Sequence, residues 1–130
     1  RGDIMSAFHR RLTGDNEKEQ LECALAWSVW EMETSKLYVD PKYIARAADD
    51  AKFALEFARI ECHYFVNAGF FECDGQIIRD APLLKDVPGT IVQGRYDMVC
   101  PAKTAWDLHQ QVPHFQFHMV ADAGHSCGEP

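Results

Sequence analysis

Two short apolar segments separated by a helical pattern constrain the fold of this chain more than any other feature. "TIVQG" at residues 90–94 is a short apolar run bounded by glycine, which predicts a strand buried on both faces. Residues 101–112 have the pattern of a helix, and "FQFHMV" at 115–120 alternates as a half-exposed strand does. Strand, helix and strand in so short a span predict a βαβ unit with parallel strands and a right-handed crossover.

The part of the chain before this unit is predicted to be helical. Asn16, with Glu19 three residues later, resembles a capping box, and Asp40 followed by Pro41 is a second start signal. After Pro41 the chain contains neither proline nor glycine up to residue 68 and is rich in alanine, so the pattern is equally compatible with one long helix or two abutting helices. The sequence therefore predicts a helical layer followed by a piece of α/β sheet.

Size and charge restrict the class of protein. At 130 residues the chain is long enough for one domain with its own core. Its formal net charge of −7 argues against nucleic acid or an anionic membrane surface as the main partner. No apolar run approaches the roughly 18 residues of a membrane span, and no signal peptide is recognisable at the start of the sequence. We therefore expect a soluble, cytoplasmic protein.

Cysteine and histidine spacing points away from structural metals and disulfides. The five cysteines are odd in number and form no C-x-x-C pair, which favours free thiols in a reducing compartment. The six histidines show no H-E-x-x-H or similar ligand spacing. The sequence thus predicts no metal site and no cofactor, and it carries no signal for an oligomeric state.

Two polar loops follow the two predicted strands. "GRYD" follows the first strand and contains Asp97, and "DAGH" follows the second and contains His125. Functional groups in open α/β sheets collect beyond the carboxyl ends of the strands, so we expect these two side chains at one edge of the sheet. A carboxylate there accepts the imidazole N–H and fixes its tautomer. The structural alternatives are a turn residue capping the helix near Pro101 and a surface histidine.

Four separated motifs resemble one enzyme family. "GRYDMVCP" at 94–101 followed by "VADAGHS" at 120–126 is similar to the C-terminal part of an α/β-hydrolase, specifically of the prolyl aminopeptidase (proline iminopeptidase) family. "ALAWSVWEMETS" at 24–35 and "FARIECHYFVNAGFF" at 57–71 resemble the helical cap of that family. The resemblance implies a Ser-Asp-His enzyme that removes N-terminal proline from peptides, with Asp97 and His125 as triad members.

The resemblance also implies a division of the chain and a missing part. Residues 1–82 would form a partial helical cap domain, and residues 83–130 the C-terminal part of the hydrolase core. The family's order is serine, acid, histidine, with the serine in a G-x-S-x-G elbow. No serine of this sequence has that surrounding, and no oxyanion-hole motif is present, so both are expected upstream and the fragment alone is expected to be inactive. Ser126 is rejected as a nucleophile because adjacent side chains rarely converge productively.

Two glutamates are candidates for binding the substrate. Glu61 lies four residues from both Phe57 and Phe65 on one predicted helical face, where a carboxylate is costly to desolvate without a cationic partner such as a free peptide N-terminus. The resemblance places a second amine-binding acid at Glu33, although Glu31 is close enough in sequence to compete for that role. Two acids around one ammonium would select a free N-terminus.

Other interpretations of the same residues stay open. Glu61 has an ion pair with Arg59 or Arg46 as its structural alternative. The family resemblance places Cys100 near the active site without making it the nucleophile. An α/β-hydrolase acting on another ester, amide or epoxide is the second enzymatic hypothesis, and a non-catalytic helical interaction module is the third.

Overall fold

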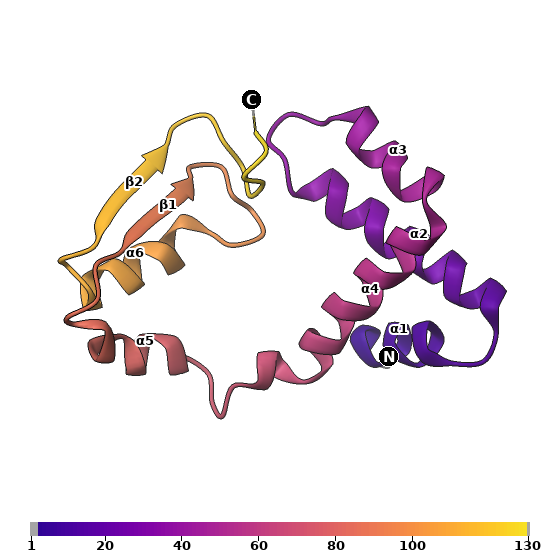
Figure 1. The fold of residues 1–130 in the computed structure, drawn as a ribbon, viewed down its shortest axis with the longest axis horizontal. Helices are drawn as coiled ribbons and strands as arrows, with labels where there is room; N and C mark the ends of the chain where they lie inside the picture. Colours follow the sequence, from indigo (N-terminus) through magenta and orange to yellow (C-terminus); the bar gives the residue numbers. More distant parts are fainter. Residues whose placement is uncertain (1–2, 130) are drawn as a thin grey trace. The chain divides into compact units, whose positions relative to one another are not determined.

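The computed structural model describes residues 3–129, which form two compact units (Figure 1). The first unit comprises the residues up to Glu33 together with Asp40–Phe71, and it is helical. The second comprises Thr34–Val39 and the residues from Glu72 onward, and it holds the sheet. The predicted mixed α/β class is confirmed, whereas the assignment of 1–82 to a cap and 83–130 to a hydrolase core stays a prediction.

The helices and strands are as follows. The described part of the first unit contains α1 (Ile4–Thr13), α2 (Glu17–Thr34), α3 (Pro41–Asp49), α4 (Ala51–Val66) and the short 3-10 helix η1 (Ala68–Phe70). The second contains α5 (Gln76–Asp80), the 3-10 helix η2 (Ala81–Leu84), β1 (Thr90–Gly94), α6 (Ala102–Gln111) and β2 (Gln116–Val120). Both predicted strands and the helix between them are confirmed, and α1 is a helix that the sequence analysis did not identify.

The predicted helix starts are occupied by capping side chains. Oδ1 of Asn16 accepts the backbone N–H of Glu19 at 3.2 Å, which begins α2. Oδ1 of Asp40 accepts the N–H groups of Lys42 and Tyr43 at 3.0 and 3.3 Å, which begins α3. A cap of this kind satisfies N–H groups that have no partner inside the helix. Both predicted start signals are therefore confirmed.

The long alanine-rich segment folds as two abutting helices. Asp50 breaks the helical path with φ −126° and ψ 86°, and its carboxylate accepts the N–H of Phe53 at 2.9 Å. Asp50 thus ends α3 and caps α4, which decides between the two alternatives left by the sequence.

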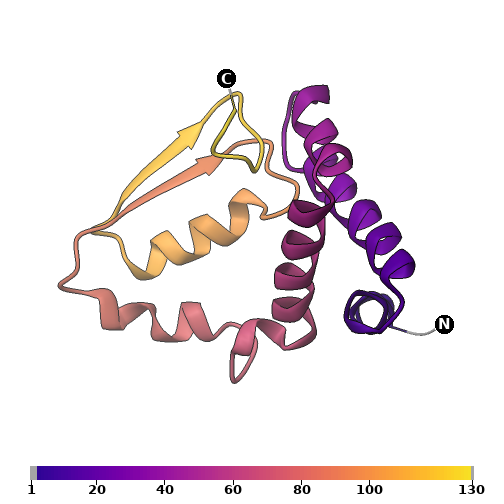
Figure 2. The ribbon, with the colours of Figure 1, turned by 45° about the vertical axis from the view of Figure 1, so that its right-hand side comes forward.

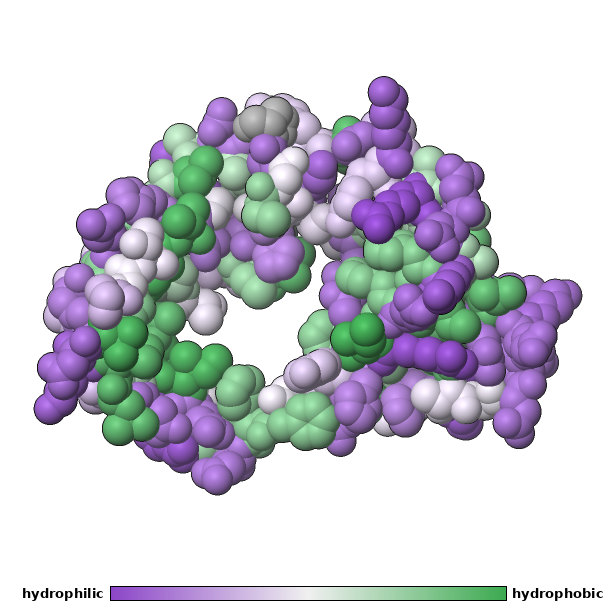
Figure 3. Space-filling model, in the orientation of Figure 1, coloured by the Kyte–Doolittle hydropathy of each residue, from purple (hydrophilic) through white to green (hydrophobic). Residues whose placement is uncertain are grey.

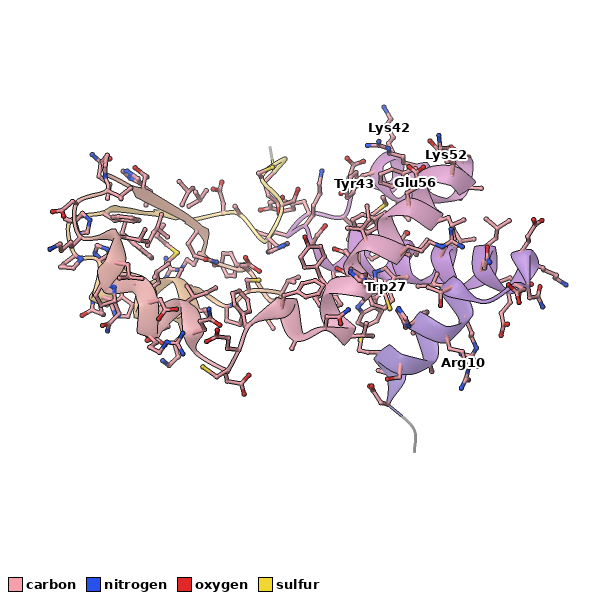
Figure 4. All side chains as sticks on the ribbon, turned by 60° about the horizontal axis from the view of Figure 1, so that its bottom comes forward. Arg10, Trp27, Lys42, Tyr43, Lys52 and Glu56 are labelled. Atoms are coloured by element: carbon pink, nitrogen blue, oxygen red, sulfur yellow. The ribbon has the colours of Figure 1, made fainter. Side chains whose placement is uncertain are left out.

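The core of the first unit gathers where α1, α2 and α4 pack. Its buried members are four small residues, one leucine and one tryptophan, namely Leu12, Ala24, Trp27, Ala54, Ala58 and Cys62. The ring of Trp27 meets that of Phe8 edge-on, with centroids 5.2 Å apart, and is labelled in the middle of the helices in Figure 4. The same view places Lys52 and Glu56 at the exposed start of α4, where they form an i,i+4 ion pair.

The second unit is built on the predicted βαβ element. β1 and β2 are neighbours and run parallel, so that Gly94 at the end of β1 lies opposite Val120 at the end of β2. Helix α6 lies along one face of the two strands (Figure 2), where Trp106 packs edge-on against Phe117 with ring centroids 5.7 Å apart. The parallel pairing is therefore confirmed.

The prediction that β1 is buried on both faces is wrong for the chain described here. Val92 is 67% exposed, because only α6 covers the two-stranded sheet within residues 3–129. Green hydrophobic surface is visible at several places on the molecule in Figure 3. In the second unit, Leu83 and Val87 are among the exposed hydrophobic residues. Parallel sheets are normally covered on both faces, so this open face is unusual for its class.

None of the helices in the described residues is long and apolar enough to cross a bilayer.

We predict that Asp50→Ala lowers the free energy of unfolding by about 1 kcal/mol, because α4 loses its capping side chain. Urea unfolding followed by circular dichroism measures this loss. Asp49→Ala is the matched control, since it removes the same charge one residue earlier without removing a cap. Equal destabilisation by both substitutions would contradict a capping role for Asp50.

Candidate active site

The loops after β1 and β2 run side by side beyond the strand ends. The N–H of Arg95 donates to the carbonyl of Val120 at 2.9 Å, and the N–H of Tyr96 donates to that of Ala123 at 3.0 Å. These bonds continue the strand pairing into the two loops. Residues a few positions beyond each strand are therefore brought together, as the parallel topology predicts.

A missing side chain allows this close approach. A Cβ atom added to Gly94 would lie 1.9 Å from the carbonyl oxygen of Gly124 and 2.8 Å from that of Ala123. Both obstacles are backbone atoms, which cannot turn aside as a flexible side chain can. Only glycine fits at position 94, and the loop carrying His125 packs directly against it.

Asp97 and His125 meet at this edge of the sheet. The Nδ1 atom of His125 lies 3.0 Å from Oδ2 of Asp97. The Asp97 side chain is 7% exposed and that of His125 is 40% exposed, so the carboxylate is shielded while the imidazole reaches the surface of its unit. The predicted meeting of these two side chains is confirmed, whereas their catalytic role stays a prediction.

The second carboxylate oxygen of Asp97 anchors the turn before α6. Its Oδ1 accepts the backbone N–H groups of Val99 and Cys100 at 3.0 and 2.8 Å. The structural alternative is therefore right in making Asp97 a turn residue and wrong in making it a helix cap, because α6 begins without a capping side chain. One oxygen of Asp97 holds the turn and the other faces His125. This division fixes the carboxylate without using the oxygen that the imidazole needs.

The surroundings of Asp97 favour its ionised form. Burial by itself acts to raise the pKa of Asp97, but the N–H of Cys100, the His125 imidazole and the Gln93 amide outweigh it, and the net pKa lies below the ordinary aspartate value. An ionised carboxylate only accepts hydrogen bonds, so the proton between the two residues belongs to Nδ1 of His125. Nε2 on the other side of the ring is then an acceptor when the imidazole is neutral.

The sequence analysis missed two side chains that support the pair. Gln93, buried at the end of β1, donates from Nε2 to Oδ2 of Asp97 at 3.2 Å and to the carbonyl of Cys100 at 3.1 Å. Glu129 accepts the N–H of Gly124, next to His125, at 3.0 Å. A polar amide inside an apolar strand was the available signal for Gln93, whereas no local pattern indicates Glu129.

The two predicted substrate-binding acids lie on helices of the first unit. Oε2 of Glu61 accepts the indole N–H of Trp27 at 2.8 Å, a partner that sequence spacing did not indicate. The proposed ion pairs do not form within residues 3–129, because Arg59 donates to the carbonyl of Leu12 and Arg46 lies over the ring of Phe53. Glu33 is exposed near the end of α2.

An apolar cavity of about 350 Å³ opens beside Trp27. It is lined by hydrophobic and aromatic residues and one acid, namely Ile4, Met5, Phe8, Ala26, Trp27, Trp30, Glu31 and Phe65. Its single carboxylate comes from Glu31 rather than from Glu33. Of the two acids considered from the sequence for the second amine-binding position, Glu31 is therefore the one that faces this cavity.

Metal and thiol chemistry find little support in the described residues. No three histidine, cysteine, aspartate or glutamate side chains among residues 3–129 gather as metal ligands would. Partial burial and the nearby charge of Asp97 raise the pKa of the Cys100 thiol. A raised pKa leaves less thiolate at neutral pH, which makes Cys100 a poor nucleophile.

The chain is similar to several proteins that are named proline iminopeptidase. A proline iminopeptidase from Xanthomonas citri is 56% identical over all 130 residues of the chain. One from Arabidopsis thaliana is 46% identical over 127 residues, and one from Neisseria gonorrhoeae is 34% identical over 130 residues. The chain spans 41%, 33% and 40% of the length of these three relatives. No protein-family model matches it. The resemblance noted in the sequence motifs is therefore confirmed.

We predict that Gln93→Met raises the pKa of Asp97, because the carboxylate loses a donor that favours its charged form. A carbon-13 NMR titration of the carboxyl group measures the pKa directly. A lowered pKa stabilises the folded state above the unfolded-state value, and this contribution disappears as the pH falls through the folded-state value. The variant should therefore be less stable than the parent protein at neutral pH, and this difference should shrink as the pH falls through the folded-state pKa of Asp97.

Gln116→Met is the control for this prediction, since Gln116 begins the neighbouring strand at an exposed position. It should leave the pKa of Asp97 unchanged. An unchanged pKa in Gln93→Met as well would show that the amide does not support the carboxylate.

Proposed function

We propose that this chain, a homologue of the proline iminopeptidases, is part of a serine exopeptidase that releases N-terminal proline from peptides. The observation that carries the proposal is the hydrogen bond between His125 and the buried Asp97, at the ends of two adjacent parallel strands. The relatives' shared name supports the reaction. A non-catalytic interaction module would need Asp97 only for the turn that its Oδ1 holds, and would not need the bond from its Oδ2 to His125.

His125 acts as the general base and Asp97 as its partner. With Nδ1–H held by Asp97, the Nε2 atom takes the proton of an attacking hydroxyl and later returns it to the leaving amine. The ionised carboxylate keeps the tautomer fixed and stabilises the imidazolium formed between these steps. The steps assigned to these residues need neither a metal nor a cofactor.

The remaining catalytic groups come from outside these 130 residues. An α/β-hydrolase supplies its serine from a strand-to-helix elbow and its oxyanion hole from backbone N–H groups. In this proposal residues 83–130 are the C-terminal part of such a core, and residues 1–82 belong to its helical cap. The exposed face of the two-stranded sheet supports the proposal, because further elements would cover it.

Glu61 and Glu33 bind the free N-terminal ammonium of the substrate. An amine paired with carboxylates distinguishes a chain end from an internal peptide bond, which carries no charge. The aromatic residues around Trp27 offer an apolar surface for the pyrrolidine ring. Glu31, which lines the cavity, competes with Glu33 for the second position.

The composition is consistent with a peptide-cleaving enzyme of the cytoplasm. All five cysteines are free thiols, which favours a reducing compartment. The net charge of −7 suits a cationic peptide N-terminus better than nucleic acid or an anionic membrane.

We predict that Asp97→Asn and His125→Ala each lower the kcat of the complete protein by about three to four orders of magnitude. Steady-state cleavage of a proline anilide measures the loss, and circular dichroism checks the fold. His118→Ala removes a histidine of β2 whose ring lies beside Gln116 and not at the Asp97–His125 pair, so it should keep far more turnover than either site variant. Near-normal rates in either site variant would remove that residue from the mechanism. A fluorophosphonate should label a serine outside these 130 residues.

We predict that Glu61→Gln and Glu33→Gln lower kcat/KM for a proline anilide by about 30-fold or more, as expected when a hydrogen bond between two charged groups loses one of its charges. Hydrolysis of an uncharged ester should change little, because it has no ammonium. Glu31→Gln tests which acid of α2 takes part. Equal losses on both substrates would favour a hydrolase with another substrate class.

A further inference from the structure

Three consecutive backbone N–H groups around His125 are engaged by neighbouring groups. The N–H groups of His125 and Ser126 both donate to the carbonyl oxygen of Ser35, at 2.9 and 2.8 Å. The preceding N–H, of Gly124, donates to Oε1 of Glu129 at 3.0 Å. The path of the loop is therefore fixed immediately before and after the histidine.

Glu129 joins this loop to the segment that follows α2. Its Oε1 also accepts the N–H of Leu37 at 2.6 Å, so a single oxygen bridges two parts of the chain that are distant in sequence. A Cβ atom on Gly124 would lie 2.8 Å from the Leu37 nitrogen and 3.0 Å from this oxygen, which shows how tightly the bridge is packed. Hydrogen bonds to a carboxylate are stronger than those to a neutral acceptor.

The second carboxylate oxygen of Glu129 is in an unfavourable environment. Oε2 is buried and has no hydrogen-bond partner within residues 3–129. Buried polar atoms are usually paired, and an unpaired one destabilises a fold. A glutamate kept in this setting is explained by what its other oxygen holds in place.

We propose that Glu129 is a positioning residue that keeps His125 in register with Asp97. The imidazole is 40% exposed, so packing alone does not fix it, and its orientation depends on the backbone that carries it. Without the Glu129 carboxylate, the N–H groups of Gly124 and Leu37 lose their acceptor and the loop can move. The 3.0 Å contact between Nδ1 of His125 and Asp97 then opens. The catalytic consequence rests on the proposed function, whereas the structural consequence does not.

The first test is spectroscopic and independent of activity. Nitrogen-15 NMR of the neutral imidazole in the complete protein distinguishes the Nδ1–H tautomer from the Nε2–H tautomer. The parent protein should show Nδ1–H at His125, and Glu129→Ala should shift the population towards Nε2–H. Glu129→Gln keeps an oxygen that can accept both N–H groups, so it should retain most of the Nδ1–H form. This variant is measured in place of Glu129→Ala if the alanine variant does not fold.

The second test is kinetic. Glu129→Ala should lower kcat about 10- to 100-fold, as misplaced catalytic groups do, with KM changed by less than about twofold. Glu129→Gln should lie between it and the parent protein. Asp122→Ala removes a negative charge from an exposed position in the same loop, so unchanged kinetics there exclude a general charge effect.

The outcomes separate this inference from the proposed function. A parent protein that shows the Nδ1–H tautomer but cleaves no proline substrate would contradict the function and leave the positioning role to be judged by NMR. If Glu129→Ala loses thermal stability but keeps the tautomer and kcat, Glu129 is merely structural and the inference is wrong. A parent protein with the Nε2–H tautomer at His125 would also overturn it.

Discussion

The close approach of Gly94 to the carbonyl oxygen of Gly124 is the constraint on which the candidate site depends. Asp97 and His125 both come from irregular loops beyond the strands, and the separation of these loops is set at this contact. Because glycine has no Cβ atom, the two loops run close enough for a direct hydrogen bond between Asp97 and His125. The Asp97 carboxylate then divides its oxygens between the turn before α6 and the imidazole.

Much of the fold follows from local patterns, and its exceptions have physical causes. The caps at Asn16 and Asp40 were predictable because a short polar side chain before a helical run satisfies free N–H groups nearby. The break at Asp50 was not, because Asp49 and Asp50 stand in an alanine-rich run without proline or glycine. The exposure of Val92 was also unpredictable, since an apolar strand pattern does not reveal whether the chain supplies a second covering layer.

The candidate site was predictable only where sequence order fixes spatial order. Parallel strands place their carboxyl ends at one edge, so Asp97 and His125 could be paired from the βαβ pattern alone. Leu37 and Glu129 meet through a hydrogen bond spanning 92 positions, and no periodicity encodes such a contact. Gln93 was hidden for a different reason, because a single amide in an apolar strand does not reveal which carboxylate it supports.

The hydrogen bond from Trp27 to Glu61 raises the question of whether this carboxylate can still bind a ligand. The indole N–H occupies Oε2 only, and a carboxylate oxygen pair offers about four acceptor positions, so binding of an ammonium does not require this bond to break. Trp27 is itself held by the buried core of the first unit, which makes it a rigid donor. An acid oriented before its ligand arrives loses less conformational freedom on binding than one on a mobile side chain. The bond from the indole is therefore compatible with the ammonium binding that we propose for Glu61.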